Sequence, residues 1–352
     1  MKRFLLIFLL APLFVSAQEI ESKIVQAEAL VSAYFEENNL PGMAVSIFLD
    51  NQMVWSEGFG YANIDQKIQV DPSKTKFRIG SVSKTLTSAA LGNLIEKDLL
   101  DPDSIVQTYV PLFPVKEYPI TVRQVAGHIA GIRHYRGIEF MSTKLYKTVD
   151  EGLIIFQDDP LLFEPGTHYS YSSYGWNLIS AIVEGASEEA FLDYMKAYVF
   201  EPFGMHNTVP EWSNQEIDHI SSFYVPSIYG NEIAPYVDNS YKWAGGGFVG
   251  TTEDLIRFGQ AYLDADFQSK ETQAELMTPL FLTNGETTNY GMGWRTWVYN
   301  EENWIGHSGG SVGGSTMFVM SKDHRMIIAY TINRSSVNFD GLHWDLIDIF
   351  LD

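Results

Sequence analysis

Apolar and polar residues alternate at both ends of the chain, and turn residues separate the alternating runs, which is the pattern of β-strands. Toward the N-terminus the pattern predicts a β-hairpin that turns at Asp50-Asn51 and a further short strand: residues 44–49, 53–56 and 77–79. Toward the C-terminus it predicts an antiparallel meander: residues 304–305, 316–320 and 325–331. Strands therefore come from both ends of the chain.

Between these ends, apolar residues recur every three or four positions, which is the spacing of amphipathic helices. One predicted helix has its apolar face over residues 86–95, and a second, over 191–198, ends before Pro202. A third is predicted to begin at Thr251, with Asp254 three residues later to complete the cap. The middle of the chain is therefore mainly helical.

This order of elements predicts an α+β fold, in which an antiparallel sheet built from both chain ends forms an α/β sandwich and a helical subdomain is inserted between them. No internal repeat or linker-like stretch divides the sequence. We expect one domain over residues 18–352, with the sheet part at about 18–80 and 240–352 and the helical part at about 81–239. The active site is expected in the cleft between the two parts.

The first 17 residues have the composition of a signal peptide. Lys2 and Arg3 precede a short apolar run, and residues 15–17 form a small-residue cleavage sequence. The alternative, a membrane anchor, needs about 20 apolar residues, which is more than this run supplies. We expect cleavage before Gln18 and export across the inner membrane, to the periplasm or the outside of the cell, with no later membrane span.

The composition excludes several kinds of chemistry. The 352 residues include no cysteine, so disulfides, thiolate metal sites and a cysteine nucleophile are excluded. Acidic residues outnumber basic ones by 44 to 23, and the formal net charge of −21 should repel nucleic acid.

Two Ser-x-x-Lys sequences place a hydroxyl and an amine three residues apart, so that on a helix they share one face. Ser73 and Lys76 lie in a polar stretch, which we interpret as an exposed turn with a hydrated lysine. Ser81 instead follows an apolar strand and Gly80 and begins the next predicted helix, where its N–H can bind negative charge. Lys84, if placed in the cleft, can lose its proton through desolvation and a nearby cation. The alternative for this pair is a capping serine and a surface lysine.

A rival nucleophile is Ser308, because residues 306–310, Gly-His-Ser-Gly-Gly, match the Gly-x-Ser-x-Gly nucleophile elbow. Its partners would be Asp323 with His324 or His343. An elbow needs a helix after the serine, and the residues that follow predict strands instead.

Residues 164–176 are dense in hydroxyl and aromatic groups and precede a helix-like run. A buried phenol beside an ammonium can titrate well below its usual pKa of about 10. On this basis we expect Tyr171 to carry protons between Ser81 and a leaving group. The alternative is that these aromatic residues only fill the core.

Several short motifs follow one another along the chain: Pro41–Val45, Phe77–Lys84, His128–Ile132, Pro165-Gly166 with Tyr171–Ser173, Ala244–Val249, Tyr290–Trp294 and His307–Gly309. In this order they resemble the class C β-lactamase and DD-peptidase-like serine hydrolases, which include esterases and peptidases. The resemblance covers nearly all of the chain after the signal peptide. Gly131–Tyr135 and Tyr171–Gly175 are especially similar to the filament-forming mitochondrial β-lactamase-like serine peptidase of animals.

The resemblance implies a β-lactamase/transpeptidase-like fold and an acyl-transfer site. Ser81 would be the nucleophile, and Lys84 and Tyr171 would share the acid/base work. The N–H groups of Ser81 and Gly310 would form the oxyanion hole. The element that receives the substrate would consist of His307, Ser308 and Gly309, with Gly310 and Ser173 beside it.

Two departures from the family pattern turn the interpretation away from β-lactam antibiotics. Where β-lactamases of this class carry Tyr-x-Asn, the chain has Ser173, whose side chain offers no amide donor. Where they carry Lys-Thr-Gly, it has His307, so a group with an unperturbed pKa of about 6.5 replaces a fixed positive charge.

The leading hypothesis is a secreted serine hydrolase that forms an acyl-enzyme on Ser81 and acts as an esterase or peptidase on a small-molecule or peptide acyl substrate. Two alternatives use the same fold: a non-catalytic binding or assembly protein, and a class C-type β-lactamase or D-alanyl-D-alanine carboxypeptidase. A metal hydrolase that uses His128 and His134 lacks a helix-spaced His-x-x-x-His pair. No cofactor and no nucleic acid partner is expected, and homo-oligomer formation stays open.

Overall fold

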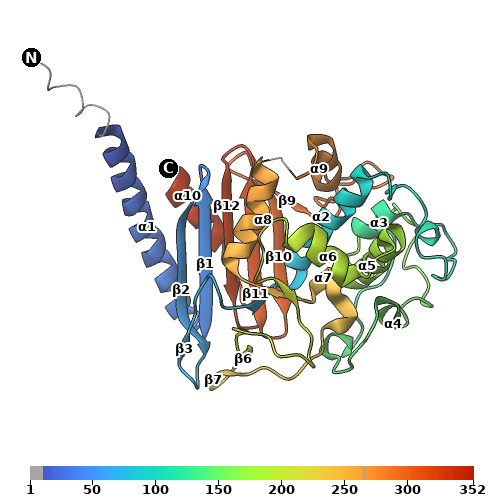
Figure 1. Ribbon diagram of the computed structural model, residues 1–352, viewed down its shortest axis with the longest axis horizontal. Coiled ribbons are helices and arrows are strands. Elements are labelled where there is room, and N and C mark those ends of the chain that lie inside the picture. The colour runs from blue at the N-terminus through green and yellow to red at the C-terminus, as the bar shows by residue number, and fades with distance from the viewer. Residues whose placement is uncertain (1–10, 265–266) are drawn as a thin grey trace, which may run out of the picture.

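A seven-stranded antiparallel sheet, of order β3-β2-β1-β12-β11-β10-β9, is the centre of the computed structural model (Figure 1). The structure describes residues 11–264 and 267–352. The strands of this sheet are β1 Gly42–Leu49, β2 Gln52–Asn63, β3 Ile68–Gln69, β9 Arg295–Tyr299, β10 Glu302–Ser311, β11 Gly314–Ser321 and β12 Met326–Ile332.

Strands from the two chain ends meet in the middle of the sheet, where β1 pairs with β12 and Val45 lies opposite Tyr330. The predicted N-terminal hairpin and C-terminal meander are therefore confirmed, and so is the α+β fold. Strand β2 runs seven residues past the predicted end at residue 56, because its backbone keeps pairing with β1 through Gly58 and Gly60. These glycines interrupt the apolar pattern without interrupting the hydrogen bonds.

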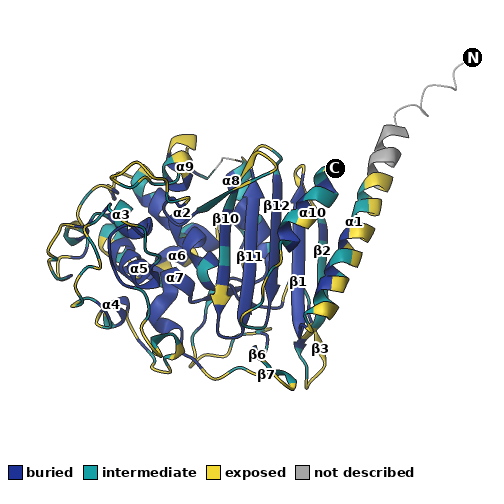
Figure 2. Ribbon diagram, turned by 180° about the vertical axis from the view of Figure 1, so that it is seen from behind, coloured by how far each residue is buried: buried dark blue, intermediate teal, exposed yellow. Residues whose placement is uncertain are grey.

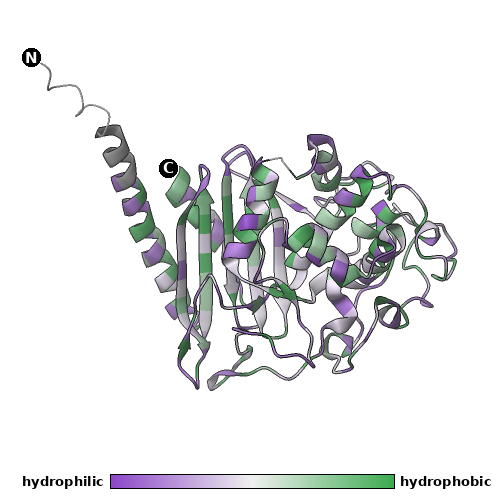
Figure 3. Cartoon of the chain, in the orientation of Figure 1, coloured by the Kyte–Doolittle hydropathy of each residue, from purple (hydrophilic) through white to green (hydrophobic). Residues whose placement is uncertain are grey.

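Helices cover both faces of the sheet. On one face lies α8 (Thr252–Asp264), and on the other lie α1 (Ala11–Glu37) and α10 (Leu342–Leu351) (Figures 1 and 2). Neighbouring residues of β12 therefore enter different cores: Ile327 packs with α8, and Ile328 packs with α1 and α10. Figure 3 shows the hydrophobic residues gathered on these central strands.

The starts of α8 and α1 can be compared with the predicted helix cap and the predicted signal peptide. Asp254 N–H donates to Thr251 Oγ1 at 3.1 Å, so the cap expected for α8 is present. Helix α1 begins at Ala11, and the cleavage point expected before Gln18 lies within it. The first ten residues of the predicted signal peptide lie outside the described residues. Within the described ranges, no helix has the length and hydropathy needed to cross a membrane.

The helical part lies beside the β9 edge of the sheet (Figure 1). Its larger helices, α2 and α5, contact each other, and α9 contacts α2 although it follows α8 in the chain. Helices outside the sheet layers are α2 Ser83–Glu96, α3 Val122–Ala126, α4 Val149–Leu153, α5 Ser173–Ser187, α6 Phe191–Met195, α7 Trp243–Gly246 and α9 Lys270–Met277. Short 3₁₀ turns are η1 Gly80–Val82, η2 Val106–Thr108, η3 Glu139–Met141 and η5 Ser240–Lys242, and η4 Lys196–Phe200 is a π-turn.

Two small sheets complete the fold. The first, β4-β8-β5, joins the predicted strand before Ser81 to the segment before α8, and the second is a hairpin, β6-β7. Their strands are β4 Phe77–Arg78, β5 Val209–Pro210, β6 Tyr224–Ser227, β7 Gly230–Ile233 and β8 Phe248–Gly250.

Two glycines let β10 approach the turn η1 at backbone contact. Gly80 has a φ of +51°, and a Cβ there would lie 2.8 Å from Gly310 N. A Cβ at Gly309 would lie 2.0 Å from the carbonyl oxygen of Ile79. Any side chain at either position would push the strand away from the turn that holds Ser81.

Gly309→Ala should therefore destabilise the protein by about 1–3 kcal/mol, because neither contacting backbone can move away cheaply. The matched control is Gly310→Ala, since a Cβ at Gly310 meets nothing within 4 Å. The control should change the free energy of unfolding by less than about 0.5 kcal/mol. Urea unfolding followed by tryptophan fluorescence measures both, and equal effects at the two positions would contradict the proposed close approach.

Candidate active site

Ser81 lies in the turn between β4 and α2, where the chain leaves a strand and enters a helix. It is half-buried in η1, and Lys84 lies one turn later, in the first turn of α2. Lys84 Nζ is 3.1 Å from Ser81 Oγ. The side chains of Ser81 and Lys84 therefore meet at the start of α2, as predicted. The alternative of a surface lysine is wrong because Lys84 is fully buried.

The amine of Lys84 has carbonyl and hydroxyl neighbours and no carboxylate partner within the described residues. It donates to the carbonyl of Gly245 at 2.6 Å, and it lies 3.4 Å from Ser173 Oγ. Burial, reinforced by the positive charges of Lys242 and Arg295, holds the pKa of Lys84 well below its ordinary value of 10.5. The expected loss of charge at this lysine is thus supported by its surroundings, and a neutral amine can accept the proton of a hydroxyl.

Tyr171 reaches the same hydroxyl from the other side. Its phenol donates to Ser81 Oγ at 2.8 Å, and its ring lies 4.9 Å from Lys84 Nζ. Burial raises the pKa of Tyr171 above its usual value of 10, so the expectation of a lowered phenol pKa is wrong. The cause is desolvation: the phenol is buried, and the hydrogen bond to Ser81, which acts in the opposite direction, does not offset it.

The buried His128 and the half-buried His134 hold the segment that carries Tyr171. Ser172 N–H donates to His128 Nδ1 and Ser173 N–H donates to His134 Nδ1, both at 3.0 Å. Burial and the nearby Lys84 lower the pKa of both imidazoles, to about 4 for His134. They are therefore neutral acceptors for backbone amides, a positioning role that the sequence analysis missed. Within the described residues no group of three or more His, Asp or Glu side chains could hold a metal ion.

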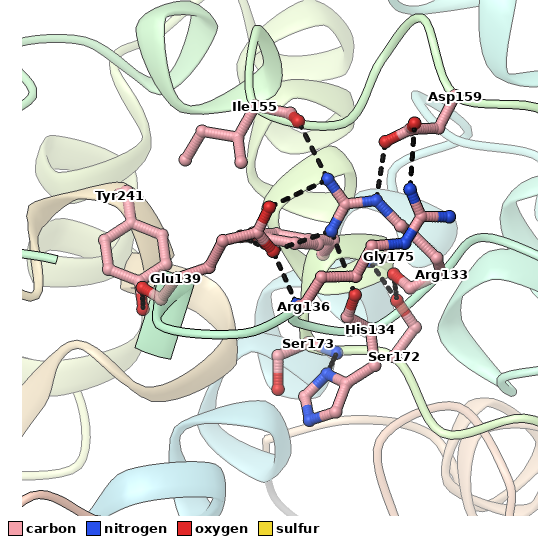
Figure 4. Close-up of polar contacts among 11 residues, drawn as sticks. Arg133, His134, Arg136, Glu139, Ile155, Asp159, Ser172, Ser173, Gly175 and Tyr241 are labelled. Atoms are coloured by element: carbon pink, nitrogen blue, oxygen red, sulfur yellow. Dashed lines mark hydrogen bonds and ion pairs between the residues drawn. The ribbon is translucent and has the colours of Figure 1, made fainter. Parts of the chain in front are cut away.

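An ion-pair network fixes the loop that carries His134 (Figure 4). The Arg133 guanidinium lies 2.7 Å from a Glu139 carboxylate oxygen and 2.5 Å from one of Asp159. The hydroxyl of Ser172 donates to the carbonyl of Arg133 at 2.7 Å and accepts from Gly175 N–H at the start of α5. The loop and the Tyr171 segment are thus tied together by side chain and backbone alike.

Strand β10 forms the opposite wall of the site. It pairs with β9 only from Glu302 to Gly306, so residues 307–311 have no strand partner on that side in the part of the chain described. His307 is buried, lies 2.9 Å from the Tyr290 hydroxyl through Nε2, and has a pKa well below 6.5 because of desolvation and the nearby Lys84. This position therefore carries no positive charge at neutral pH.

The rival Ser308 elbow is wrong. Ser308 lies inside β10, opposite Met317 of β11, and a hairpin rather than a helix follows it. Its suggested partners lie elsewhere: His343 is 3.2 Å from the Tyr330 hydroxyl, and His324 is 3.7 Å from Glu302.

The second Ser-x-x-Lys pair is not assembled either. The hydroxyl of Ser73 donates to Asp71, and Lys76 donates to the carbonyl of Asp218 at 3.0 Å. Lys76 is nevertheless buried, so the expectation of a hydrated lysine is wrong. Packing of β4 against the segment near Ile220 covers this side chain, which the polar local sequence did not indicate.

A cavity of about 440 Å³ opens over Ser81. Of the predicted site residues, Ser81, Tyr171, Ser173, His307, Ser308 and Gly310 line it, whereas Lys84 and Gly309 lie behind this surface. The lining residues that the site prediction missed are His134, Tyr135, Phe140, Lys242, Gly245, Gly246 and Arg295. Lys242 gave no sequence signal beyond its place just before the Ala244–Val249 motif, and Arg295 follows the Tyr290–Trp294 motif in the same way.

Comparison with known proteins shows the family of the chain. The family model described as Beta-lactamase matches residues 27–350. The chain is 31% identical over 381 aligned positions to the mitochondrial serine beta-lactamase-like protein LACTB of Homo sapiens, covering 81% of this chain and 69% of that protein. It is 32% identical over 301 positions to penicillin-binding protein 4* of Bacillus subtilis (strain 168), covering 80% of this chain and 66% of that protein.

Solved structures give the same result. An octameric penicillin-binding protein homologue from Pyrococcus abyssi superposes with a TM-score of 0.79 at 25% identity, covering 93% of this chain and 77% of that chain. The D-amino acid amidase from Ochrobactrum anthropi has a TM-score of 0.79 at 19% identity over 94% of this chain and 97% of its own, which shows the shared fold. By the match along nearly its whole length and by its relatives, the chain belongs to the Beta-lactamase family of serine hydrolases.

Proposed function

We propose that the protein hydrolyses acyl compounds through an acyl-enzyme on Ser81, as an esterase or peptidase rather than as an efficient β-lactamase. One observation carries the proposal: Ser81 Oγ lies 3.1 Å from a buried amine and accepts a 2.8 Å hydrogen bond from a buried phenol. A serine hydroxyl is a weak nucleophile, and it needs a neutral base within hydrogen-bond reach. Lys84 meets that need because desolvation favours its neutral form.

In the proposed reaction, Ser81 Oγ attacks the acyl carbonyl while its proton passes to Lys84. The oxyanion that forms is held by the N–H groups of Ser81 and Gly310, which the close approach of Gly80 and Gly310 supports. Tyr171, which is protonated before the reaction, donates its proton to the leaving group. The proton that Lys84 took from Ser81 then passes to Tyr171 and restores the phenol. Water then repeats the steps in reverse to release the acid.

Two features support esters or peptides as substrates over penicillins. Ser173 offers a hydroxyl where an amide donor would be needed, and its N–H is already committed to His134. His307 is neutral and bonded to Tyr290, so it does not supply the charge that a β-lactam carboxylate would bind. The intact contacts around Ser81 also weigh against the alternative of a non-catalytic binding protein.

Export and self-association are secondary parts of the proposal. The basic and apolar composition of residues 1–17 supports export by a signal peptide. The relative from Pyrococcus abyssi is described as octameric, which supports a test for homo-oligomers here.

A fluorophosphonate probe should add its mass to the peptide that contains Ser81, and Ser81→Ala should abolish labelling. The same variant should lower kcat/KM for a p-nitrophenyl ester by a factor on the order of 10³ or more, because the nucleophile is gone. Ser73→Ala, the same change in the other Ser-x-x-Lys sequence, is the control and should label normally. Mass spectrometry of the digested protein identifies the peptide that carries the probe. Modification of Ser308 would contradict the proposal.

Lys84→Met should change stability in a pH-dependent way. Between the lowered pKa of folded Lys84 and its unfolded value of about 10.4, the unfolded chain binds one more proton, so wild-type stability rises with pH. The free energy of unfolding of the variant minus that of wild type should therefore be larger at pH 7 than at pH 10. Activity should fall about 10²–10⁴-fold.

Urea unfolding at the two pH values measures this difference. The exposed Lys147→Met is the control and should shift the free energy of unfolding by less than about 0.5 kcal/mol at either pH. A Lys84→Met difference that stays constant from pH 7 to pH 10 would mean that Lys84 is charged in the folded protein.

Tyr171→Phe should keep the buried ring and lose only the hydroxyl. Because the proposed proton donor is absent, kcat should fall about 10²–10⁴-fold with an amide substrate, whose leaving group must be protonated. The loss should be smaller with a p-nitrophenyl ester, whose leaving group departs as an anion. Steady-state kinetics with both substrates test this, and equal losses would assign Tyr171 a purely structural role.

A further inference from the structure

The cavity over Ser81 is positively charged, although the protein as a whole is strongly acidic. The chain has a formal net charge of −21, yet among the described residues the charged ones that line this cavity are Lys242 and Arg295, with no Asp or Glu. At physiological salt, surface charges are screened beyond about 8 Å, so the groups inside the cavity decide which ligand charge it accepts.

Lys242 lies at the end of η5, against the aromatic wall of the cavity. Its side chain is 97% removed from solvent, since its residue exposure is 3%. Its Nζ lies 4.5 Å from the ring centre of Phe140 and 5.5 Å from that of Tyr241. Within residues 18–264 and 267–352 this amine forms no hydrogen bond and no ion pair.

The carboxylate whose charge acts on Lys242, that of Glu211, is already paired with Arg78. Glu211 accepts hydrogen bonds from Arg78 Nε at 2.9 and 2.8 Å, from Arg78 Nη2 at 2.5 Å and from Asn239 Nδ2 at 2.7 Å. Arg78 therefore balances the charge of Glu211, which leaves no unpaired carboxylate for Lys242 there. Arg133 is likewise paired, with Glu139 and Asp159.

Arg295 is the second cation of the cavity that has no carboxylate partner in the described chain. It is half-buried at the start of β9, and its Nε is buried without a hydrogen-bond partner. A buried charge without a partner costs free energy that the fold does not recover from its own contacts. One buried and one half-buried cation, neither with a carboxylate partner among the described residues, face the same cavity and indicate that a ligand supplies the opposite charge.

Building on the acyl-transfer function proposed above, we propose that Lys242 is a specificity-determining residue that binds a carboxylate of the substrate, with Arg295 adding to the positive field. The substrate class is then an ester or amide whose acyl part bears a second, ionised carboxyl group. In the bound state the carboxylate accepts hydrogen bonds from Lys242 Nζ, and the aromatic wall keeps water from this ion pair. This cation stands at a different place from the His307 position of β10, which carries no charge.

The preference for such substrates should weaken as pH rises. Burial and the charge of Arg78 lower the pKa of Lys242 to about 7, so the free amine loses its charge above that pH. The other groups facing it do not titrate in this range: His134 has a pKa of about 4, Tyr135 one of about 12, and the pKa of Tyr241 is raised further by burial. Lys84, as the proposed base, acts on both kinds of substrate, so its titration should cancel in a comparison of two esters.

The test compares two esters that differ in one carboxylate, mono-p-nitrophenyl adipate and p-nitrophenyl hexanoate. For the wild type, the ratio of kcat/KM for adipate to that for hexanoate should exceed one at pH 6 and should fall toward pH 8.5. Lys242→Met should lower the ratio about tenfold or more at pH 6, and Arg295→Met should lower it less. The exposed Lys144→Met, which removes the same charge elsewhere, should leave the ratio within about twofold.

A binding measurement separates this inference from the proposed reaction. Monomethyl adipate should raise the melting temperature of Ser81→Ala, and it should not do so when Lys242→Met is added. If the wild type hydrolyses neither ester but this shift is seen, the proposed function fails and the carboxylate site stands. A ratio that is unchanged in Lys242→Met, or a shift that survives Lys242→Met, overturns the carboxylate site while the hydrolase stands.

Discussion

The burial of Lys84 with no carboxylate partner among the described residues is the constraint on which the site depends. A charged ammonium there would lose its hydration without gaining an opposite charge, so its surroundings favour the neutral amine. Tyr171 keeps its proton and donates to Ser81 Oγ, and the neutral amine of Lys84 lies 3.1 Å from the same oxygen, within reach of the hydroxyl proton. A carboxylate beside Lys84 would stabilise its charged form and remove the base.

The fold supplies this arrangement by bringing distant segments to one place. The nucleophile turn follows a strand of the small sheet, the carbonyl acceptor Gly245 comes from α7, and the wall of β10 comes from the C-terminal meander. Backbone-to-backbone contact at Gly80 and Gly309 sets the distance between the turn and β10. The central strands β1, β11 and β12 hold this arrangement in place because they are buried on both faces, as their dark blue colour in Figure 2 shows.

Electrostatics separates the cations of the site into two kinds. Arg78 and Arg133 hold loops in place and are neutralised by Glu211, Glu139 and Asp159. Lys84, Lys242 and Arg295 face or underlie the cavity and have no such partner among the described residues. Desolvation is the main cause of the lowered pKa of Lys84 and of His307, and nearby cations reinforce it, those of Lys242 and Arg295 in the case of Lys84. The charges of Lys242 and Arg295 also define which ligand charge the cavity accepts. The same positive electrostatic field therefore affects both the base and the binding of a charged substrate.

The sequence by itself determined the fold class, the two-ended sheet, the cap at Thr251 and the identity of Ser81, Lys84 and Tyr171 as the assembled group. Periodicity and motif order carry this information because they depend on neighbours along the chain. Tertiary structure decided the charge states. The raised pKa of Tyr171, the lowered pKa of His307 and the exposure of Lys242 to the cavity depend on which segments bury each group and which carboxylates are already paired. Desolvation acts through contacts in space, so no local pattern could report it.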